Sequence, residues 1–254
     1  MKSIYMSLRN QKTMKERFTT DRPMNLVCNM VHRALIEQVA KRSRKFMLTD
    51  DVRQQIIDVS TWLTDPKAKP WLFLCGQIGN GKSSMLRAMQ RVLAELGLPL
   101  SDEFGYTYDG SLYDSCRPYL QIRRANEILM ESANGYESFK KLMKMPMLAI
   151  DDLGVEPAEI KDYGSTRTPI IDLLGYRYEE QLFTMISTNV TPDYIKLNYG
   201  DRIADRFNEM AHRVIYKNDS FRKPQSPNPP IRADTKEPDS KTSNNPPNKT
   251  TSNK

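Results

Sequence analysis

The apolar residues follow two different periods along the chain, and the change falls near residue 70. Between residues 24 and 64 they recur at helical spacing, which predicts two helices. The apolar face of the first helix comprises Val27, Met30, Val31, Ala34, Leu35 and Val39. The second helix begins near Thr49 and Asp50, a capping residue followed by an acidic first turn, and ends before Pro66.

From Trp71 onward, short apolar runs alternate with helical patterns. The runs cover residues 71–76, 119–123, 147–152, 183–188 and 213–217, and helices are expected to begin near Lys82, Asn126, Arg167 and Asp201. Strands separated by helices are typical of a parallel α/β sheet, because each helix carries the chain back to the edge where the next strand begins. Residues 99–118 have no clear period and predict a long loop or insertion.

The composition is that of a globular protein, with 39% hydrophobic and 27% charged residues. No run approaches the roughly 18 apolar residues of a membrane span, and the first residues lack the apolar block of a secretory signal. The cysteines, Cys28, Cys75 and Cys116, are far apart and odd in number, which disfavours a disulfide framework or a zinc ribbon. We therefore expect a cytoplasmic protein that does not contact the membrane.

Basic residues concentrate at both ends of the chain. Residues 1–50 hold eleven Lys/Arg against four Asp/Glu, and residues 223–254 hold six against three. The tail contains seven of the sixteen prolines and no aromatic residue, a composition that buries too little apolar surface to fold. We expect a basic helical extension over 1–66, an α/β domain over 67–222 and a disordered tail over 223–254. The basic ends suit a nucleic acid or an acidic partner, and simple solvation explains them equally well.

A phosphate-binding loop (P-loop) follows the first apolar run. The residues Gly76-Gln-Ile-Gly-Asn-Gly-Lys-Ser83 match G-x-x-x-x-G-K-[ST], and an amphipathic helix follows them. In such a loop the backbone N–H groups and the helix N-terminus face phosphate oxygens. Lys82 supplies a charge to the β- and γ-phosphates, and Ser83 supplies a hydroxyl to Mg²⁺. The predicted ATP contacts in the loop are Gly76, Gln77, Ile78, Gly79, Asn80, Gly81, Lys82, Ser83 and Ser84.

Two acids end the apolar run at 147–150. The carboxyl end of a parallel strand is the edge where ligands bind, so Asp151 is predicted to hold Mg²⁺ together with Ser83. Asp152 is predicted to polarise the water that attacks the γ-phosphate. Many ATPases of this kind carry the longer Glu there, so Asp152 predicts slow turnover.

Polar residues also follow the later strands. Asn189 is predicted to contact the attacking water or the γ-phosphate, and otherwise to form the turn before the next helix. Arg202 and Arg206 lie four residues apart on one helical face. This spacing predicts an arginine finger that enters the nucleotide site of the adjacent subunit. The alternative is that both arginines pair with acids on their own helix. Arg222 is predicted to contact the nucleotide of its own subunit, or to have no role.

The segments GQIGNGKSS, LAIDDLGVE, MISTNV, YGDRIADRF and NDSFR resemble, in order and spacing, the motifs of the DnaC/DnaI helicase loaders and the related IstB transposition ATPases. The resemblance covers roughly residues 71–222. It implies an AAA+ P-loop core with a five-stranded parallel sheet in the order 5-1-4-3-2, and a homo-oligomer that forms with nucleotide. It further implies contact with single-stranded DNA and with a DnaB-type replicative helicase, the latter through the basic helices before Lys45.

The DNA-contacting residues implied by the resemblance lie between the second strand and Asp151. They are Arg123, Arg124, Lys140 and Lys141, and Tyr136 and Phe139 offer stacking surfaces. Basic residues on exposed helices are also commonly just solvated.

The leading hypothesis is an ATP-dependent helicase loader that hydrolyses ATP between subunits. The same core serves IstB-like transposition ATPases, whose partner is a transposase. A P-loop kinase is a different class, and Asn189 and the arginine helix argue against it. A non-catalytic adaptor that uses ATP only as a structural switch remains an alternative.

Overall fold

The computed structural model describes residues 18–96, 120–157, 159–162 and 165–222. The helices are α2 (Met24–Ala40), α3 (Asp50–Thr64), α4 (Lys82–Leu96), α5 (Ala125–Ala133), α6 (Tyr136–Met143), α7 (Pro169–Glu179), α8 (Pro192–Tyr199) and α9 (Asp201–Met210). The strands are β1 (Trp71–Gly76), β2 (Gln121–Arg124), β3 (Met147–Leu153), β4 (Ile160–Asp162), β5 (Ser165–Arg167), β6 (Phe183–Thr188) and β7 (Ala211–Tyr216). The expected insertion at 99–118 and the expected disordered tail after 223 lie outside the described residues.

Five parallel strands form one sheet in the order β2-β3-β6-β1-β7. With the five strands numbered along the chain, this is the order 5-1-4-3-2 read from the β7 edge, so the predicted fold class is confirmed. β6 lies between β1, which leads into the P-loop, and β3, whose last three residues include the two acids. Because all five strands are parallel, the carboxyl ends of these three neighbours meet at one edge of the sheet.

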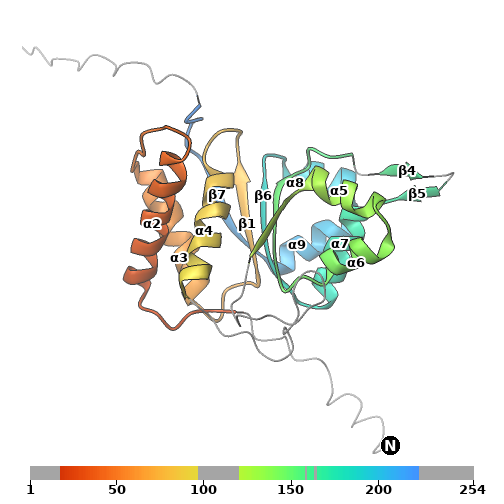
Figure 1. The fold of residues 1–254 in the computed structure, drawn as a ribbon, viewed down its shortest axis with the longest axis horizontal. Coiled ribbons are helices and arrows are strands. Elements are labelled where there is room, and N and C mark those ends of the chain that lie inside the picture. The colour runs from red at the N-terminus through yellow and green to blue at the C-terminus, as the bar shows by residue number, and fades with distance from the viewer. Residues whose placement is uncertain (1–17, 97–119, 158, 163–164, 223–254) are drawn as a thin grey trace, which may run out of the picture. The chain divides into compact units, whose positions relative to one another are not determined.

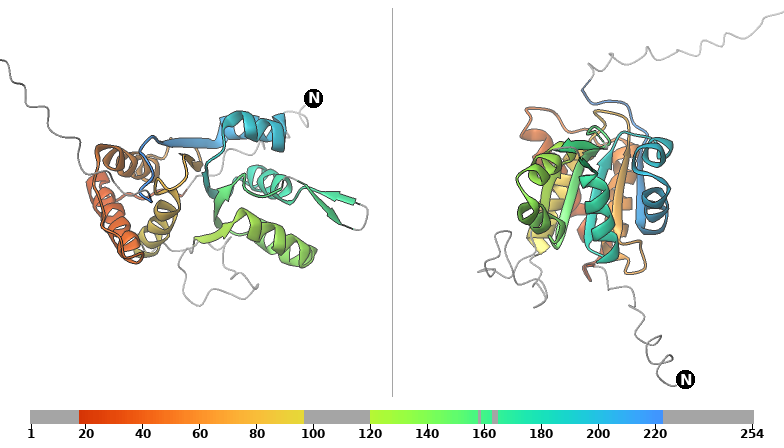
Figure 2. Two further views of the ribbon diagram at one scale, coloured as in Figure 1. Left: turned by 90° about the horizontal axis from the view of Figure 1, so that it is seen from above. Right: turned by 90° about the vertical axis from the view of Figure 1, so that its right-hand side faces the viewer.

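Helices cover both faces of this sheet (Figures 1 and 2). On one face α2, α3 and α4 enclose an apolar core with Leu72 and Leu74 of β1. On the other face α5 to α9 enclose a second core with Trp71 and Phe73. Neighbouring residues of β1 thus face opposite sides, and burying each such side chain stabilises the fold by roughly 1.5–3 kcal/mol.

The two N-terminal helices form where the spacing predicts them. Thr49 caps α3, because its hydroxyl accepts a hydrogen bond from the backbone N–H of Val52 over 3.3 Å. Their apolar faces share one core with α4 and the sheet. The described part of the extension is therefore packed on the α/β body, while the boundary at residue 66 stays a prediction.

The sequence pattern did not predict α6 or the antiparallel pair of β4 and β5. The helix has eight residues and each of the two strands has three, so each is too short to show a period of its own. Among the described residues, no helix has the length and apolar character needed to cross a membrane.

Candidate nucleotide-binding site

The P-loop runs from the last residue of β1, Gly76, to the second residue of α4, Ser83. The Lys82 ammonium lies inside the loop and donates to the carbonyls of Gly76 (2.6 Å) and Gln77 (2.7 Å) and to Asn80 Oδ1 (3.1 Å). Lys82 is only 4% exposed. Burial lowers its pKa, and the nearby Asp152 carboxylate opposes this shift. The loop thus holds a partly desolvated cation where the sequence predicts phosphate groups.

Hydrogen bonds join the P-loop to the acidic end of β3. Ser83 Oγ donates to Asp151 Oδ1 over 2.8 Å, and Ser187 Oγ, near the end of β6, donates to the same oxygen over 2.6 Å. Asp151 is 2% exposed. A hydroxyl and a carboxylate are oxygen ligands of the kind that Mg²⁺ accepts, and this ion usually completes its shell with water and substrate phosphates. Ser83 and Asp151 therefore fit the predicted metal pair.

The backbone of β3 is irregular at the second acid. Its register against β6 shifts between Ile150 and Leu153, and Asp152 has a φ of +59°, in the left-handed region. Asp tolerates this region better than most residues, and such conformations cluster at functional sites. The Asp152 N–H donates to Ser187 Oγ over 2.9 Å, which helps to hold the conformation. Burial, and then the Asp151 carboxylate, raise the pKa of Asp152.

The segment after β7 closes over the P-loop. The Phe221 N–H donates to the Gly79 carbonyl over 3.0 Å. Gly79 has a φ of +86°, and a Cβ there would lie 2.1 Å from Ser220 Oγ, so only glycine fits. The same Cβ position is 3.3 Å from Arg222 Cδ. Arg222 thus lies against the loop, where the sequence expects a contact with nucleotide in its own subunit.

A chain of buried amides connects α3 to the P-loop. Gln55 Nε2 donates to Asn218 Oδ1 over 2.8 Å, and Asn218 Nδ2 donates to the Asn80 carbonyl over 3.2 Å. Asn80 Nδ2 in turn donates to the Tyr216 carbonyl over 3.2 Å. Sequence reasoning missed Gln55 and Asn218, and the only signal was that Asn218 begins the NDSFR segment.

Asn189 follows β6 directly. Its Oδ1 is buried and has no hydrogen-bond partner within the part of the chain that the structure describes. An unpaired buried acceptor costs about 1–3 kcal/mol. This atom suits the predicted contact with an attacking water, whose hydrogen it can accept.

The two predicted finger arginines differ in their surroundings. Arg206 is 8% exposed, lies 2.6 Å from Glu179 Oε1 and stacks 4.5 Å above the Tyr178 ring. Gly175 makes room for it, since a Cβ there would lie 3.0 Å from the Arg206 guanidinium. Arg202 reaches the same Glu179 oxygen at only 3.9 Å, and its side chain is 80% exposed. Arg206 is therefore held by α7 of its own chain, and Arg202 extends into solvent.

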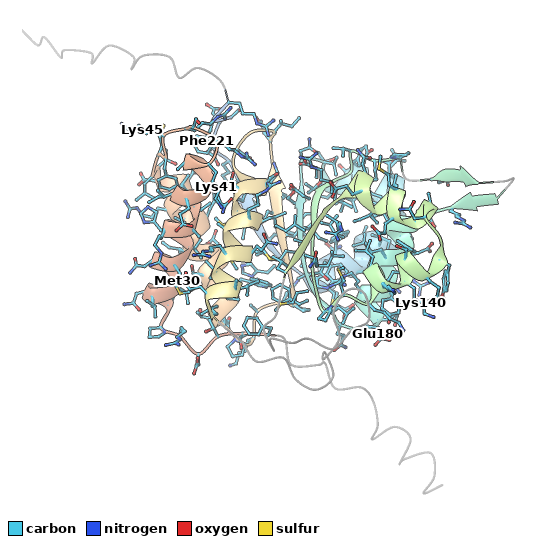
Figure 3. The ribbon with its side chains drawn as sticks, in the orientation of Figure 1. Met30, Lys41, Lys45, Lys140, Glu180 and Phe221 are labelled. Atoms are coloured by element: carbon cyan, nitrogen blue, oxygen red, sulfur yellow. The ribbon has the colours of Figure 1, made fainter. Side chains whose placement is uncertain are left out.

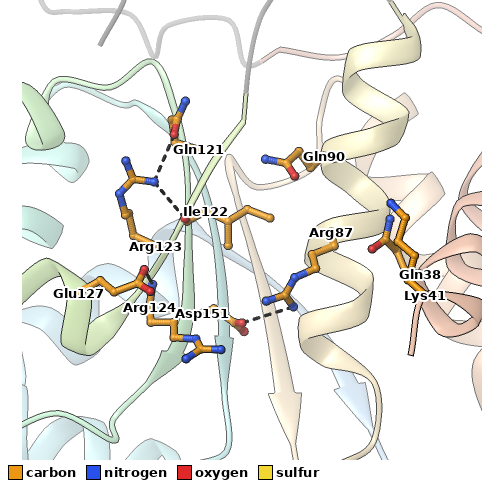
Figure 4. A pocket seen from close by; sticks show the side chains of 10 residues that line it. All are labelled: Gln38, Lys41, Arg87, Gln90, Gln121, Ile122, Arg123, Arg124, Glu127 and Asp151. Carbon is orange, nitrogen blue, oxygen red and sulfur yellow. Dashed lines mark hydrogen bonds and ion pairs between the residues drawn. The ribbon is translucent and has the colours of Figure 1, made fainter. Parts of the chain in front are cut away.

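The four residues predicted to contact DNA fall in two places. Arg123 and Arg124, at the end of β2, line a pocket of about 570 Å³ (Figure 4). Lys140 and Lys141 belong to α6. Figure 3 shows Lys140 on the other side of the sheet from Lys41, a further residue of the pocket. Arg123 and Arg124 thus line this pocket, whereas Lys140 and Lys141 are not part of its lining.

No protein-family model matches the chain, and no curated protein matches it. Among solved structures, DnaI is 18% identical, with a TM-score of 0.47 over 78% of this chain and 95% of DnaI. The DnaC helicase loader is 16% identical, with a TM-score of 0.49 over 68% of this chain and 93% of the loader. The replication initiator DnaA, bound to AMPPCP and single-stranded DNA, is 14% identical, with a TM-score of 0.47 over 68% of this chain and 49% of DnaA. The structure thus resembles those of helicase loaders and an initiator. At these identities and TM-scores the resemblance does not assign a function.

Proposed function

We propose that this chain is an ATPase of the AAA+ type that binds ATP with Mg²⁺ at the carboxyl edge of its sheet. The observation that carries this proposal is the 2.8 Å hydrogen bond between Ser83 Oγ and Asp151 Oδ1. It brings the hydroxyl of the P-loop and the acid of β3 so close that one cation would contact both. Lys82 adds the positive charge that a triphosphate needs at the same edge.

The other side chains of the site have separate roles in the proposed hydrolysis. Bound Mg²⁺ would neutralise charge that develops on the β- and γ-phosphate oxygens. Asp152 polarises the attacking water, and Asn189 Oδ1 accepts a hydrogen from that water and orients it. Arg222, against the P-loop, adds positive charge on the phosphate side. Ser187 fixes both acids through its hydroxyl.

ATP binding tests this proposal directly. We expect Lys82→Ala to lose most affinity for a fluorescent ATP analogue in the presence of Mg²⁺, and to lose ATP turnover. The control is Lys67→Ala, which removes an exposed lysine from the turn between α3 and β1 and should behave as wild type. If a folded Lys82→Ala variant, checked by thermal unfolding, bound the analogue as tightly as wild type, the site would not be a nucleotide site.

The site is completed, in this proposal, by an arginine from a neighbouring subunit. Arg202 suits this role better than Arg206, because its side chain is exposed, whereas Glu179 and Tyr178 hold Arg206 within its own chain. Arginine fingers supplied by a second chain raise turnover by about 10³–10⁵ in known cases.

Mixing two inactive variants tests a site shared between subunits. Arg202→Ala retains its P-loop, and Lys82→Ala retains its arginine, so a mixture of the two should recover part of the turnover that each lacks alone. Arg53→Ala, at an exposed arginine of α3, serves as the control. Full turnover by Arg202→Ala alone would exclude a finger at this position.

We further propose that the ATPase acts in DNA replication as a loader of a DnaB-type helicase onto single-stranded DNA. The support is the set of motifs described above, which resembles that of the DnaC/DnaI loaders. Light scattering of the protein mixed with the replicative helicase of its own source should detect a complex that forms with ATP and is lost in Lys82→Ala. Binding to a transposase instead supports the IstB-like alternative. ATP binding without turnover, even with DNA and helicase present, supports the non-catalytic adaptor.

A further inference from the structure

A basic pocket lies beside the proposed ATP site, between α2, α4 and the end of β2 (Figure 4). Its volume of about 570 Å³ falls within the roughly 300–1,000 Å³ that is typical of small-ligand sites. Four of its lining side chains are cationic: Lys41, Arg87, Arg123 and Arg124. They come from three places in the sequence, since Arg123 and Arg124 are neighbours in β2, and the fold brings these charges together.

The two acids of the pocket are already engaged. Glu127 Oε2 accepts a hydrogen bond from the Arg124 backbone N–H over 2.9 Å. Asp151 Oδ1 accepts from Ser83 and Ser187. The shortest approach of a cation to Asp151 in the pocket is the 3.9 Å between Arg87 and its Oδ2. The lining of the pocket therefore carries more positive than negative charge.

Arg42 interacts electrostatically with two residues of the lining, Arg87 and Asp151. Arg42 follows Lys41 at the end of α2, and burial lowers its pKa, with Arg87, Arg222 and Arg44 lowering it further. Like charges held this close repel each other, and an anion relieves that repulsion. Three glutamine amides, of Gln38, Gln90 and Gln121, add hydrogen-bonding groups, whereas Ile122 is the single apolar residue of the lining. Such a lining suits charged oxygens and offers little to an aromatic ring.

We propose that this pocket binds phosphate groups of a ligand other than the hydrolysed ATP, held by Lys41, Arg123 and Arg124. Phosphate is favoured over carboxylate because several cations converge on one small volume, and a phosphate or phosphodiester presents more oxygens and more charge there. The ligand is a nucleic-acid strand or a free polyphosphate, which share this chemistry.

Arg87 connects the pocket to the ATP site, and this step rests on the proposed ATPase function. Its guanidinium donates to the Ser83 carbonyl over 3.0 Å and approaches Asp151 from the pocket side (Figure 4). A phosphate in the pocket competes with Asp151 for Arg87, and so changes the charge beside the proposed Mg²⁺ position. By linkage, Mg²⁺–nucleotide then changes the affinity of the pocket by the same factor.

Oligonucleotide binding with the P-loop saturated tests the pocket. The probe is a fluorescein-labelled oligothymidylate, titrated over a range of salt with a non-hydrolysable ATP analogue and Mg²⁺ present. Lys41→Gln and Arg124→Gln should each weaken binding several-fold and reduce the slope of log affinity against log salt by about 0.7. Lys67→Gln removes the same charge from an exposed site elsewhere and should leave both quantities unchanged.

Competitors identify the class of ligand. Inorganic tripolyphosphate should displace the oligonucleotide, whereas polyglutamate of similar charge should not. If tripolyphosphate fails while the two variants still weaken binding, the pocket holds phosphate only as part of a nucleic-acid strand. Equal displacement by polyglutamate would refute the phosphate assignment.

Two parallel measurements separate this inference from the ATPase proposal. If the wild type fails to bind the ATP analogue, the ATPase proposal is wrong. If the analogue binds normally but oligonucleotide binding is the same in Lys41→Gln, Arg124→Gln and wild type, the pocket alone is wrong. In Arg87→Gln, the ratio of oligonucleotide affinities with and without the analogue should move toward one, and an unchanged ratio would contradict the link.

Discussion

Ser187 offers a sharp test of how the acids of the site are held. This fully buried hydroxyl donates to Asp151 Oδ1 over 2.6 Å and accepts from the Asp152 N–H over 2.9 Å. Ser187→Ala removes both bonds without changing the backbone of β6. Asp151 keeps its bond from Ser83, whereas the Asp152 N–H, in its left-handed conformation, loses the acceptor that holds it.

The magnitude follows from these two bonds. A buried donor left without its acceptor costs about 1–3 kcal/mol, and a hydrogen bond to a charged group contributes about 1.5–3 kcal/mol. The two effects overlap, because Asp151 retains a second donor, so we expect Ser187→Ala to lower the free energy of unfolding by about 2–3 kcal/mol. For a body of this size that is a decrease in Tm of roughly 4–12 °C. Affinity for Mg²⁺–ATP should fall as well, since Asp152 loses the acceptor that holds its backbone and Asp151 loses one of its two donors.

Urea unfolding followed by circular dichroism measures the stability, and titration with a fluorescent ATP analogue measures the affinity. The matched control is Ser60→Ala in α3, which is also fully buried but whose hydroxyl has no hydrogen-bond partner among the described residues. Ser60→Ala should leave both quantities nearly unchanged. If the two variants lost equal stability and neither lost nucleotide affinity, Ser187 would be an ordinary core residue and its role in positioning the acids would be refuted.

Three further predictions concern buried polar groups. Arg177→Met should lower the unfolding free energy by about 3 kcal/mol or more, because this fully buried guanidinium satisfies several acceptors; urea titration checks it, and Arg53→Met, at an exposed arginine, should change little. Burial raises the pKa of Glu156 above 4.5, so the folded protein binds more protons at this residue than the unfolded chain does. The unfolding free energy of wild type minus that of Glu156→Gln should therefore decrease as pH rises above 4.5. If this difference stayed constant or increased with pH, the prediction would be contradicted. Gln55→Leu leaves Asn218 Oδ1 unpaired and should weaken ATP-analogue binding several-fold, which a titration detects, and unchanged affinity would show that α3 does not support the P-loop.

The elements that the sequence predicted are those with strong local signals. The three central strands, β3, β6 and β1, are nearly continuous buried runs, as expected for strands covered on both faces, whereas the edge strands β2 and β7 carry exposed polar residues. The N-terminal helices have clear apolar faces, and α3 begins at its capping residue, Thr49. The order of the strands came from the family resemblance, since alternation alone leaves the order open. The short pair of β4 and β5 has neither kind of signal.

Contacts between distant residues explain what the sequence did not reveal about the site. Asp151, the acid at the end of β3, was predictable from its strand, but its contact with Arg87 depends on how α4 lies across the sheet. Glu179 holds Arg206 from 27 positions away, a difference from the exposed Arg202 that spacing along one helix does not reveal. Residues that act through tertiary contacts have no local pattern of their own.

The described part of the N-terminal extension is linked to the P-loop through two intermediate residues, Asn218 and Phe221. Gln55 of α3 reaches the P-loop through Asn218, and Arg44, after α2, donates to the Phe221 carbonyl over 3.5 Å. Phe221 itself donates to the carbonyl of Gly79. A partner that bound the extension and shifted α2 or α3 would therefore change the free energy of nucleotide binding by the difference in these contacts between the two states. Because such coupling is reciprocal, nucleotide would change the affinity for that partner by the same factor. An extension packed in this way would let one protein connect partner binding to ATP binding.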